Sequence, residues 1–215
     1  IFSLSNHHKL LIHLGMSGYL RITDQDNLLT KHDHVDLCLH NGLILRYNDS
    51  RRFGFWLYQF ENNILHPLLK SLGPEPLSAE LNPDYLFKIT RNKRQPIKAT
   101  LMDNHNLVGV GNIYASESLF LAQIHPARAA QSLSLSECDN LVNAIKTILK
   151  QALAAGGTTI RDFLSPTGKQ GYFTIQLKIY GRQGEACYQC QSIVEHQRIA
   201  GRSSPYCPSC QSITK

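Results

Sequence analysis

The spacing of apolar residues divides this 215-residue chain into parts with different secondary structure. In the first part, short apolar runs are separated by turns rich in Asn, Gly, Asp and Ser, a pattern typical of antiparallel strands. These runs lie at residues 1–4, 10–14, 19–22, 34–39, 43–47 and 55–58. We therefore predict an N-terminal antiparallel β-sandwich or barrel. Because the first run starts at residue 1, we expect this domain to be incomplete and the chain to begin inside it.

Helical periodicity replaces the strand pattern after a stretch that breaks regular structure. Residues 72–78 contain two prolines and a glycine, which is typical of a linker. One helix is predicted at residues 113–122. A second helix is predicted after Ser134, because Ser134 and Glu137 have the spacing of a capping box and apolar residues then recur every four positions.

The last part of the chain carries four of its six cysteines, in two Cys-x-x-Cys pairs with 16 residues between them. This spacing is typical of a four-thiolate zinc site, because each short turn aims two sulfurs at one tetrahedral centre. A redox pair is the alternative. We predict one structural Zn²⁺, since four thiolates leave no position open for a reactive water; its ligands are Cys187, Cys190, Cys207 and Cys210. The isolated Cys38 and Cys138 are predicted to be buried.

The predicted fold class is α+β. Its four segments are a partial β-sandwich, a linker, a helical domain and a zinc finger, at residues 1–66, 67–78, 79–176 and 177–215. Lys and Arg (22) exceed Asp and Glu (16), giving a formal charge of +6, which favours a polyanionic partner such as nucleic acid, although solubility alone also explains it. No apolar run reaches the length of a membrane span, so we expect a cytoplasmic protein with no membrane partner.

Two turns combine residues that suit a nucleic acid. Arg51, Arg52 and Phe53 place two cations and an aromatic ring between predicted strands, where turn chemistry alone requires neither. In the hairpin between the cysteine pairs, Arg202 lies in a turn, and its charge either contacts phosphates or balances the zinc-thiolate cluster.

The segment that contains Gly109, Gly111 and Asn112 precedes the first predicted helix. A glycine turn at a helix N-terminus can bind a phosphate through its backbone N–H groups. A turn that only lets two helices pack, with Asn112 as the N-cap, is the commoner arrangement.

Six segments, taken in order, are HLGMSG (13–18), KHDHVD (31–36), RRFG (51–54), LGPEPL (72–77), GVGNIYASE (109–117) and the paired Cys-x-x-Cys turns. Together they resemble bacterial formamidopyrimidine-DNA glycosylase over essentially the whole chain. That family excises oxidised purines, typically 8-oxoguanine opposite cytosine and formamidopyrimidines, and then cleaves the DNA at the abasic site. The resemblance implies a β-sandwich, a helix-two-turns-helix domain and a zinc finger, in a monomer that acts on double-stranded DNA in base-excision repair.

The resemblance also implies roles for single residues. His32, Arg51 and Lys93 are expected to contact DNA, Asn112 to bind a phosphate beside the lesion, and Lys98 to add to the basic surface. Arg202 matches the family's arginine that contacts phosphates flanking the lesion and is assigned as proton donor in δ-elimination. Because arginine is a poor acid at neutral pH, we favour phosphate binding for Arg202.

Two further groups of residues are implied to handle the everted base. Phe53 is expected to wedge between base pairs, Arg51 to face the orphaned cytosine and Met16 to fill the vacated space. A loop is expected to close over the base, although two glycines also make a loop merely flexible; its residues are Thr167, Gly168, Lys169, Gln170, Gly171 and Tyr172.

Two alternatives stay open. Endonuclease VIII shares the architecture and prefers oxidised pyrimidines, but the Arg51-Arg52-Phe53 turn and the long loop favour the purine enzyme. A non-catalytic, zinc-containing protein that binds damaged DNA is the second alternative.

The family's covalent chemistry gives a first prediction. There, an N-terminal proline amine attacks the sugar C1′ and forms a Schiff base, with help from a glutamate and a lysine. The 215 residues do not contain the Pro-Glu start or that lysine. We expect this polypeptide to bind DNA weakly or not at all and to lack glycosylase activity. Borohydride trapping with 8-oxoguanine DNA should give no covalent adduct, and an adduct would contradict the prediction.

Overall fold

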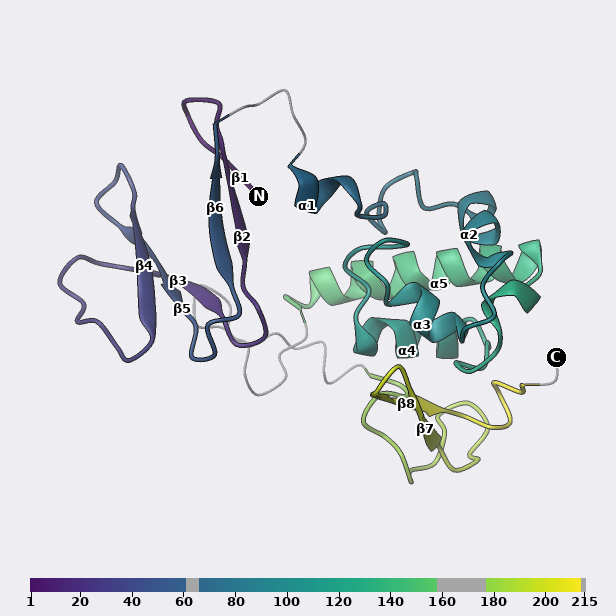
Figure 1. Cartoon of the computed structure of the whole chain (residues 1–215). Helices are drawn as coiled ribbons and strands as arrows, with labels where there is room; N and C mark the ends of the chain where they lie inside the picture. Colours follow the sequence, from purple (N-terminus) through teal and green to yellow (C-terminus); the bar gives the residue numbers. More distant parts are fainter. Residues whose placement is uncertain (61–65, 158–176, 214–215) are drawn as a thin grey trace. The chain divides into compact units, whose positions relative to one another are not determined.

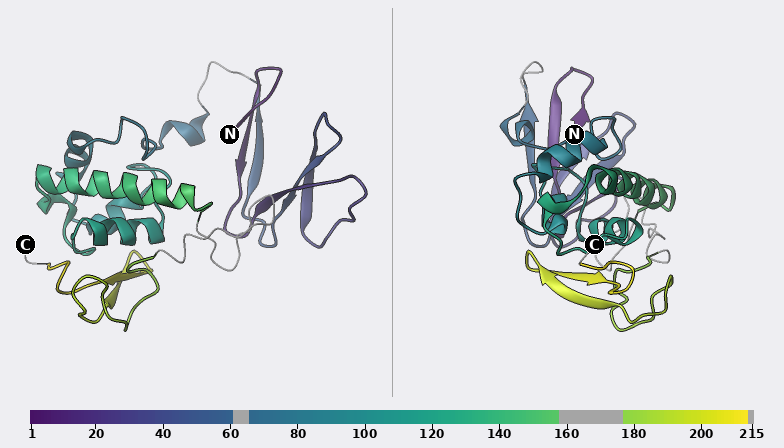
Figure 2. Two further views of the ribbon diagram at one scale, coloured as in Figure 1. Left: turned by 180° about the vertical axis from the view of Figure 1, so that it is seen from behind. Right: turned by 90° about the vertical axis from the view of Figure 1, so that its right-hand side faces the viewer.

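The structure is a computed structural model that describes residues 1–60, 66–157 and 177–213. The chain forms two compact units, residues 1–70 with 155–174 and residues 71–154 with 175–215. The first unit contains six strands and a short helix, and the second contains the longer helices and a C-terminal hairpin (Figures 1 and 2). The predicted α+β class is confirmed. Among the described helices, none combines the length and the apolar character needed to cross a membrane.

The strands of the first unit form two antiparallel sheets, with the orders β1–β2–β6 and β3–β5–β4. The strand pattern of the sequence locates each of them to within two residues at either end. Their bounds are β1 (Phe2–Ser3), β2 (Lys9–His13), β3 (Tyr19–Thr23), β4 (Asp33–Cys38), β5 (Ile44–Asn48) and β6 (Phe55–Gln59). Gly42 turns the chain between β4 and β5 with φ +82°, a conformation that suits glycine in a tight hairpin.

Strand β5 is buried from end to end because β3 and β4 pair with its two edges. Arg46 at its centre is only 3% exposed, and its guanidinium donates to both carboxylate oxygens of Asp36, at 2.8 and 2.9 Å. The prediction of a buried Cys38 is wrong. This thiol is exposed at the end of β4, which is an edge strand with solvent beside it.

The second unit has a helical core. Its helices are α2 (Pro83–Thr90), α3 (Ile97–Leu101), α4 (Asn112–Leu121), the 3₁₀ turn η1 (Ala130–Ser132) and α5 (Leu135–Ala154). Helix α4 lies beside α5 in both figures. The capping box is confirmed: Ser134 Oγ accepts from Glu137 N at 3.2 Å, and the Glu137 carboxylate accepts from Ser134 N at 2.8 Å. Cys138 is buried in this core, as predicted.

The predicted linker over residues 67–78 is more ordered than its prolines suggest. Its first residues form helix α1 (Pro67–Lys70) in the first unit. Its second half packs on the helical unit, where Gly73 N donates to the Asn104 carbonyl at 2.8 Å and the Pro74 carbonyl accepts from Val108 N at 3.3 Å. Tertiary hydrogen bonds therefore order a stretch that cannot form a regular element.

The C-terminal hairpin, β7 (Glu195–Ile199) and β8 (Arg202–Tyr206), belongs to the same unit as the helices. The buried Glu117 of α4 accepts three backbone N–H bonds from residues 178–180, at 3.0, 3.0 and 2.8 Å. Gln211 beyond the hairpin donates to the Ile124 carbonyl at 2.9 Å. These bonds attach the hairpin to the helices at both of its ends.

Glu117 is therefore expected to determine the stability of the helical unit. Glu117→Ala leaves the buried N–H of Ile179 and the part-buried N–H groups of Lys178 and Tyr180 without an acceptor. A buried unpaired group costs about 1–3 kcal/mol and a part-buried one less, so the unfolding free energy should fall by about 2 kcal/mol or more. Glu117→Gln retains one carbonyl oxygen and should lose less. Urea unfolding followed by circular dichroism measures both changes. The exposed Glu80→Ala is the control, and equal midpoints for Glu80→Ala and Glu117→Ala would contradict this role.

Candidate nucleic-acid interface and metal centre

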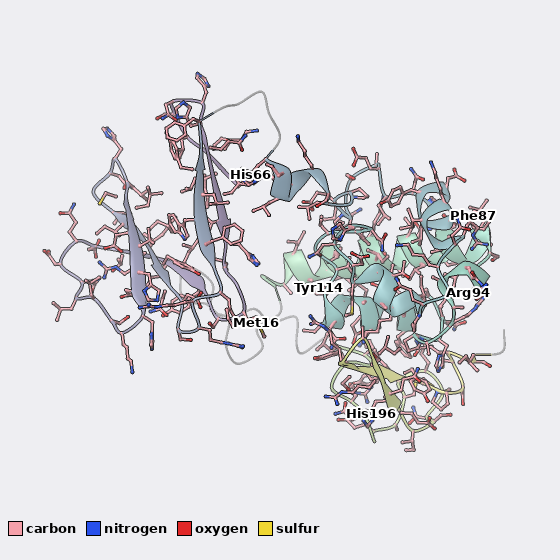
Figure 3. The ribbon with its side chains drawn as sticks, in the orientation of Figure 1. Met16, His66, Phe87, Arg94, Tyr114 and His196 are labelled. Atoms are coloured by element: carbon pink, nitrogen blue, oxygen red, sulfur yellow. The ribbon has the colours of Figure 1, made fainter. Side chains whose placement is uncertain are left out.

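Two exposed apolar side chains stand on neighbouring turns of the first unit. Met16, which is labelled in Figure 3, is 72% exposed and follows β2. Phe53 is 56% exposed and precedes β6. The turns leave the same end of the sheet because His13 of β2 pairs with Phe55 of β6. The guanidinium carbon of Arg51 lies 4.8 Å from the centre of the Phe53 ring. The structure thus brings together the three residues that were predicted to fill the gap of an everted base.

The backbone beneath these side chains is tightly packed. A Cβ at Gly54 would lie 1.8 Å from the Tyr47 hydroxyl oxygen. Gly15 has φ +67°, and a Cβ there would lie 2.8 Å from backbone atoms of both Phe53 and Gly54. The two turns are therefore in direct contact, and only glycine fits where they meet. Because the backbone of the two turns is already fixed by packing, the exposed side chains at their tips can insert into a partner molecule without a further loss of backbone entropy.

His32 lies at the same end of the first unit, just before β4, since Asp33 of β4 pairs with Asn48 at the end of β5. His32 is half-buried and has a left-handed backbone, with φ +77°. Its carbonyl accepts a hydrogen bond from Asp49 N at 3.0 Å. A third turn is thus attached to the two that carry Met16 and Phe53.

In the second unit, Lys93 is held by a residue that the sequence did not single out. Its ammonium donates to Asn106 Oδ1 at 2.7 Å. Asn106 is buried, and its amide nitrogen donates to the Thr100 carbonyl at 3.0 Å and to Asp103 Oδ2 at 3.1 Å. An asparagine in a turn is too common to carry a signal, so only the fold identifies Asn106 as a partner of Lys93.

Lys98 does not contribute to an exposed basic surface, and that expectation is wrong. Its side chain is fully buried between α3 and β8, where the ammonium donates to Ser204 Oγ at 2.8 Å and to the Ser203 carbonyl at 3.1 Å. Burial lowers the pKa of Lys98 to about 8, and the nearby charge of Arg202 lowers it in the same direction. Lys98 attaches the hairpin to the helices.

Arg202 has the exposed position that Lys98 lacks. It begins β8 directly after Ala200 and Gly201, whose φ values of +48° and +75° form a tight turn. Within the described part of the chain, no ion pair involves Arg202. Its guanidinium is available for an external anion such as a phosphate.

Asn112 is the first residue of α4, and Gly111 is the N-cap, so the alternative that made Asn112 the N-cap is wrong. The amide nitrogen of Asn112 lies 3.5 Å from the Tyr180 hydroxyl, and its Oδ1 is buried with no hydrogen-bond partner among the described residues. Gly109 in the preceding turn has φ +71°. This glycine turn and helix N-terminus have the features of an anion site. The loop predicted to close over a base, at residues 167–172, lies outside the described residues.

The four cysteines of the paired turns gather at one point. Their sulfur atoms all lie within 4.8 Å of one another, and Cys187 and Cys207 are buried against Phe120, Ile179 and Val194. A tetrahedral site with bonds of about 2.3 Å places its sulfurs about 3.8 Å apart, so the cluster matches the size of a metal site. Backbone N–H groups at Gln189 and Cys210 lie 3.4 Å from Cys187 Sγ and Cys207 Sγ, orienting these sulfurs. The cluster can hold one metal ion.

Both units match models of one family. Residues 1–56 match the formamidopyrimidine-DNA glycosylase N-terminal domain, and residues 72–164 match the formamidopyrimidine-DNA glycosylase H2TH domain. The sheets, the helical unit and the four-cysteine hairpin thus have the order found in a class of DNA glycosylases.

Similar proteins make the assignment specific. The chain is 54% identical over 197 residues to formamidopyrimidine-DNA glycosylase from Legionella pneumophila (strain Lens), covering 92% of this chain and 72% of that protein. It is 53% identical over 200 residues to the enzyme from Alcanivorax borkumensis, covering 93% and 74%. The chain belongs to the formamidopyrimidine-DNA glycosylase family.

Solved structures agree with this assignment. The MutM (Fpg) protein from Thermus thermophilus superposes with a TM-score of 0.87 at 36% identity, over 100% of this chain and 79% of that chain. Lactococcus lactis Fpg in complex with DNA containing an abasic site gives a TM-score of 0.86 at 32% identity, over 95% and 75%.

The buried ammonium of Lys98 predicts a pH-dependent stability. Its pKa is about 8 in the folded chain against an ordinary 10.5, so between these values the unfolded chain binds more protons and stability rises with pH. Relative to Lys98→Met, the parent chain should gain about 3 kcal/mol of unfolding free energy from pH 8 to pH 10.5. Urea unfolding at several pH values measures the difference, and parallel curves for the two chains would contradict it.

Proposed function

We propose that this chain binds double-stranded DNA weakly, with a preference for an oxidised purine or an abasic site. In the complete reaction that we assign, the damaged base is excised through a Schiff base, and the backbone is then cleaved by β- and δ-elimination. Within this reaction, we propose that residues 1–215 bind and position the DNA. Solved relatives support this lesion class: Lactococcus lactis Fpg mutants were solved with Fapy-dG DNA, and MutM with carbocyclic 8-oxo-G DNA.

The observation that carries the proposal is the pair of exposed apolar tips on close-packed turns. Met16 and Phe53 are 72% and 56% exposed, although burying them would be favourable. An everted nucleotide leaves an apolar gap between base pairs, which such side chains can fill. Arg51 lies beside the Phe53 ring, and its planar fork can donate to the base left without a partner.

The cations and the helix terminus have a different role, which is to hold the DNA backbone. We assign phosphate contacts to His32, Lys93, Asn112 and Arg202, which is compatible with the exposed guanidinium of Arg202 and the glycine turn before α4. We also retain the family's assignment of Arg202 as proton donor in δ-elimination as a second role. Charge neutralisation remains the main role of Arg202, because a guanidinium loses its proton only at very high pH.

We further propose that Cys187, Cys190, Cys207 and Cys210 hold one structural Zn²⁺. A four-thiolate site supplies folding energy to a hairpin too small to be stable by itself. Its effect on DNA binding is indirect, since the hairpin presents Arg202.

Oxidised pyrimidines are a second candidate lesion. One observation favours them: wild-type Lactococcus lactis Fpg, which superposes with a TM-score of 0.85, was also solved with DNA containing an oxidised pyrimidine. Binding competition between duplexes that carry either lesion would rank the two candidates.

Binding to a gap in the base stack tests the main proposal. At low salt, we expect the 215-residue chain to prefer a duplex with a tetrahydrofuran abasic analogue opposite cytosine over an intact duplex. Met16→Ala and Phe53→Ala should each reduce this preference about tenfold, since stacking on a base is worth about 1–3 kcal/mol. Fluorescence anisotropy gives both affinities.

Control variants separate base contacts from phosphate contacts. Leu28→Ala removes an apolar side chain that is 88% exposed on another loop, and it should leave the preference unchanged. Arg202→Ala should weaken binding to both duplexes alike and reduce the salt slope by about 1. Equal affinity of the parent chain for the abasic-analogue duplex and for the intact duplex would refute the proposal.

Metal content tests the cysteine cluster. Atomic emission should find one zinc per chain, and Cys207→Ser should lose the metal and lower the unfolding temperature. Cys38→Ser, which removes an exposed thiol outside the cluster, should retain both. Unchanged metal content in Cys207→Ser would contradict the site.

A further inference from the structure

Asp49 connects the turns that carry Met16, Arg51 and Phe53. It follows β5 directly and is fully buried, with 0% exposure. One carboxylate oxygen accepts from Ser17 Oγ at 2.7 Å and from Arg51 N at 3.2 Å. The other accepts from the Tyr47 hydroxyl at 2.9 Å and from Gly54 N at 2.9 Å. Ser17 follows Met16, and Arg51 and Gly54 flank Phe53, so one side chain joins the two tips.

The backbone of Asp49 adds the third turn. Its N–H donates to the His32 carbonyl at 3.0 Å, and its own carbonyl lies 2.8 Å from His34 Nε2. The three turns that carry the proposed DNA contacts of the first unit therefore share one residue.

The negative charge of Asp49 requires that its hydrogen-bond donors stay in place. No ion pair among the described residues involves Asp49, so hydrogen-bond donors alone stabilise its buried charge. The Ser17 hydroxyl, followed by the Gly54, Tyr47 and Arg51 donors, holds the pKa of Asp49 well below its usual range despite burial. Loss of any donor would leave a buried anion undersolvated, so the carboxylate holds the turns in a single arrangement.

We infer that Asp49 is a positioning residue that holds Met16, Arg51 and Phe53 in the arrangement that fills the gap left by an everted base and contacts the base left without a partner. This inference rests on the function proposed for those three side chains. An asparagine cannot replace the aspartate, because two of the four donors would then face an amide NH₂ group. Asp49 itself does not reach the DNA, since it lies beneath the turns.

The test compares Asp49→Asn with Asp36→Asn. Asp36 pairs with Arg46 at 2.8 Å in the same sheet and touches none of the three turns, so its substitution removes an equal charge away from them. The first measurement is hydrogen exchange at the Arg51 and Gly54 amides. We expect exchange at least tenfold faster in Asp49→Asn and unchanged exchange in Asp36→Asn; unchanged exchange in Asp49→Asn would overturn the inference.

The second measurement is the ratio of affinities for an abasic analogue opposite cytosine and opposite adenine. Asp49→Asn should bring this ratio close to one while its affinity for intact DNA stays within twofold, and Asp36→Asn should retain the parent ratio. A retained ratio in Asp49→Asn overturns the inference. If the affinities of the parent chain for the two duplexes are equal, the role proposed for Arg51 at the unpaired base fails, and the amide exchange alone decides whether Asp49 positions the turns.

A milder variant covers the case in which Asp49→Asn does not fold. Ser17→Ala removes one of the four donors and creates no clash. It should show the same changes at smaller size, and a parent-like ratio together with parent-like exchange in a folded Ser17→Ala would overturn the inference.

Discussion

Two buried carboxylates, Glu117 and Asp49, hold the parts of this protein that are candidates to touch DNA. Neither has a cation as partner among the described residues; Glu117 accepts three backbone N–H groups, and Asp49 accepts two N–H groups and two hydroxyls. A buried charge requires several donors in defined places. Backbone donors place the main chain itself, so Glu117 positions the start of the hairpin segment and Asp49 positions the turns at the end of the sheets.

This arrangement separates the groups that build the site from those that face the solvent. Lys98 and Arg202 illustrate the division, because they lie near each other and have the same charge. Lys98 is buried and bonded to the backbone of β8, whereas Arg202 is exposed at the start of that strand. The buried Lys98 side chain joins the hairpin to α3 through its hydrogen bonds, and the exposed guanidinium of Arg202 is available to a phosphate.

Much of the architecture follows from local patterns. The strands of the first unit, the capping box before α5 and the four-cysteine cluster were all predicted, because alternation, N-capping and Cys-x-x-Cys spacing act over a few residues. Two of the predictions that failed concern burial. Cys38 was expected to be buried and lies on an edge strand, and Lys98 was expected on the surface and is fully buried. The residues next to a side chain in the sequence do not determine which parts of the folded chain cover it.

The sequence alone determined the class of fold and the candidate metal ligands, since these depend on residue type and short spacing, whereas the tip residues Met16, Arg51 and Phe53 were expected from the family resemblance. Only the tertiary structure identified Asp49, Glu117 and Asn106, which the sequence presents as ordinary polar residues in turns and a helix. Their partners lie up to 63 positions away along the chain. The worth of a buried polar group depends on the donors that surround it, and these are assembled only when the chain folds.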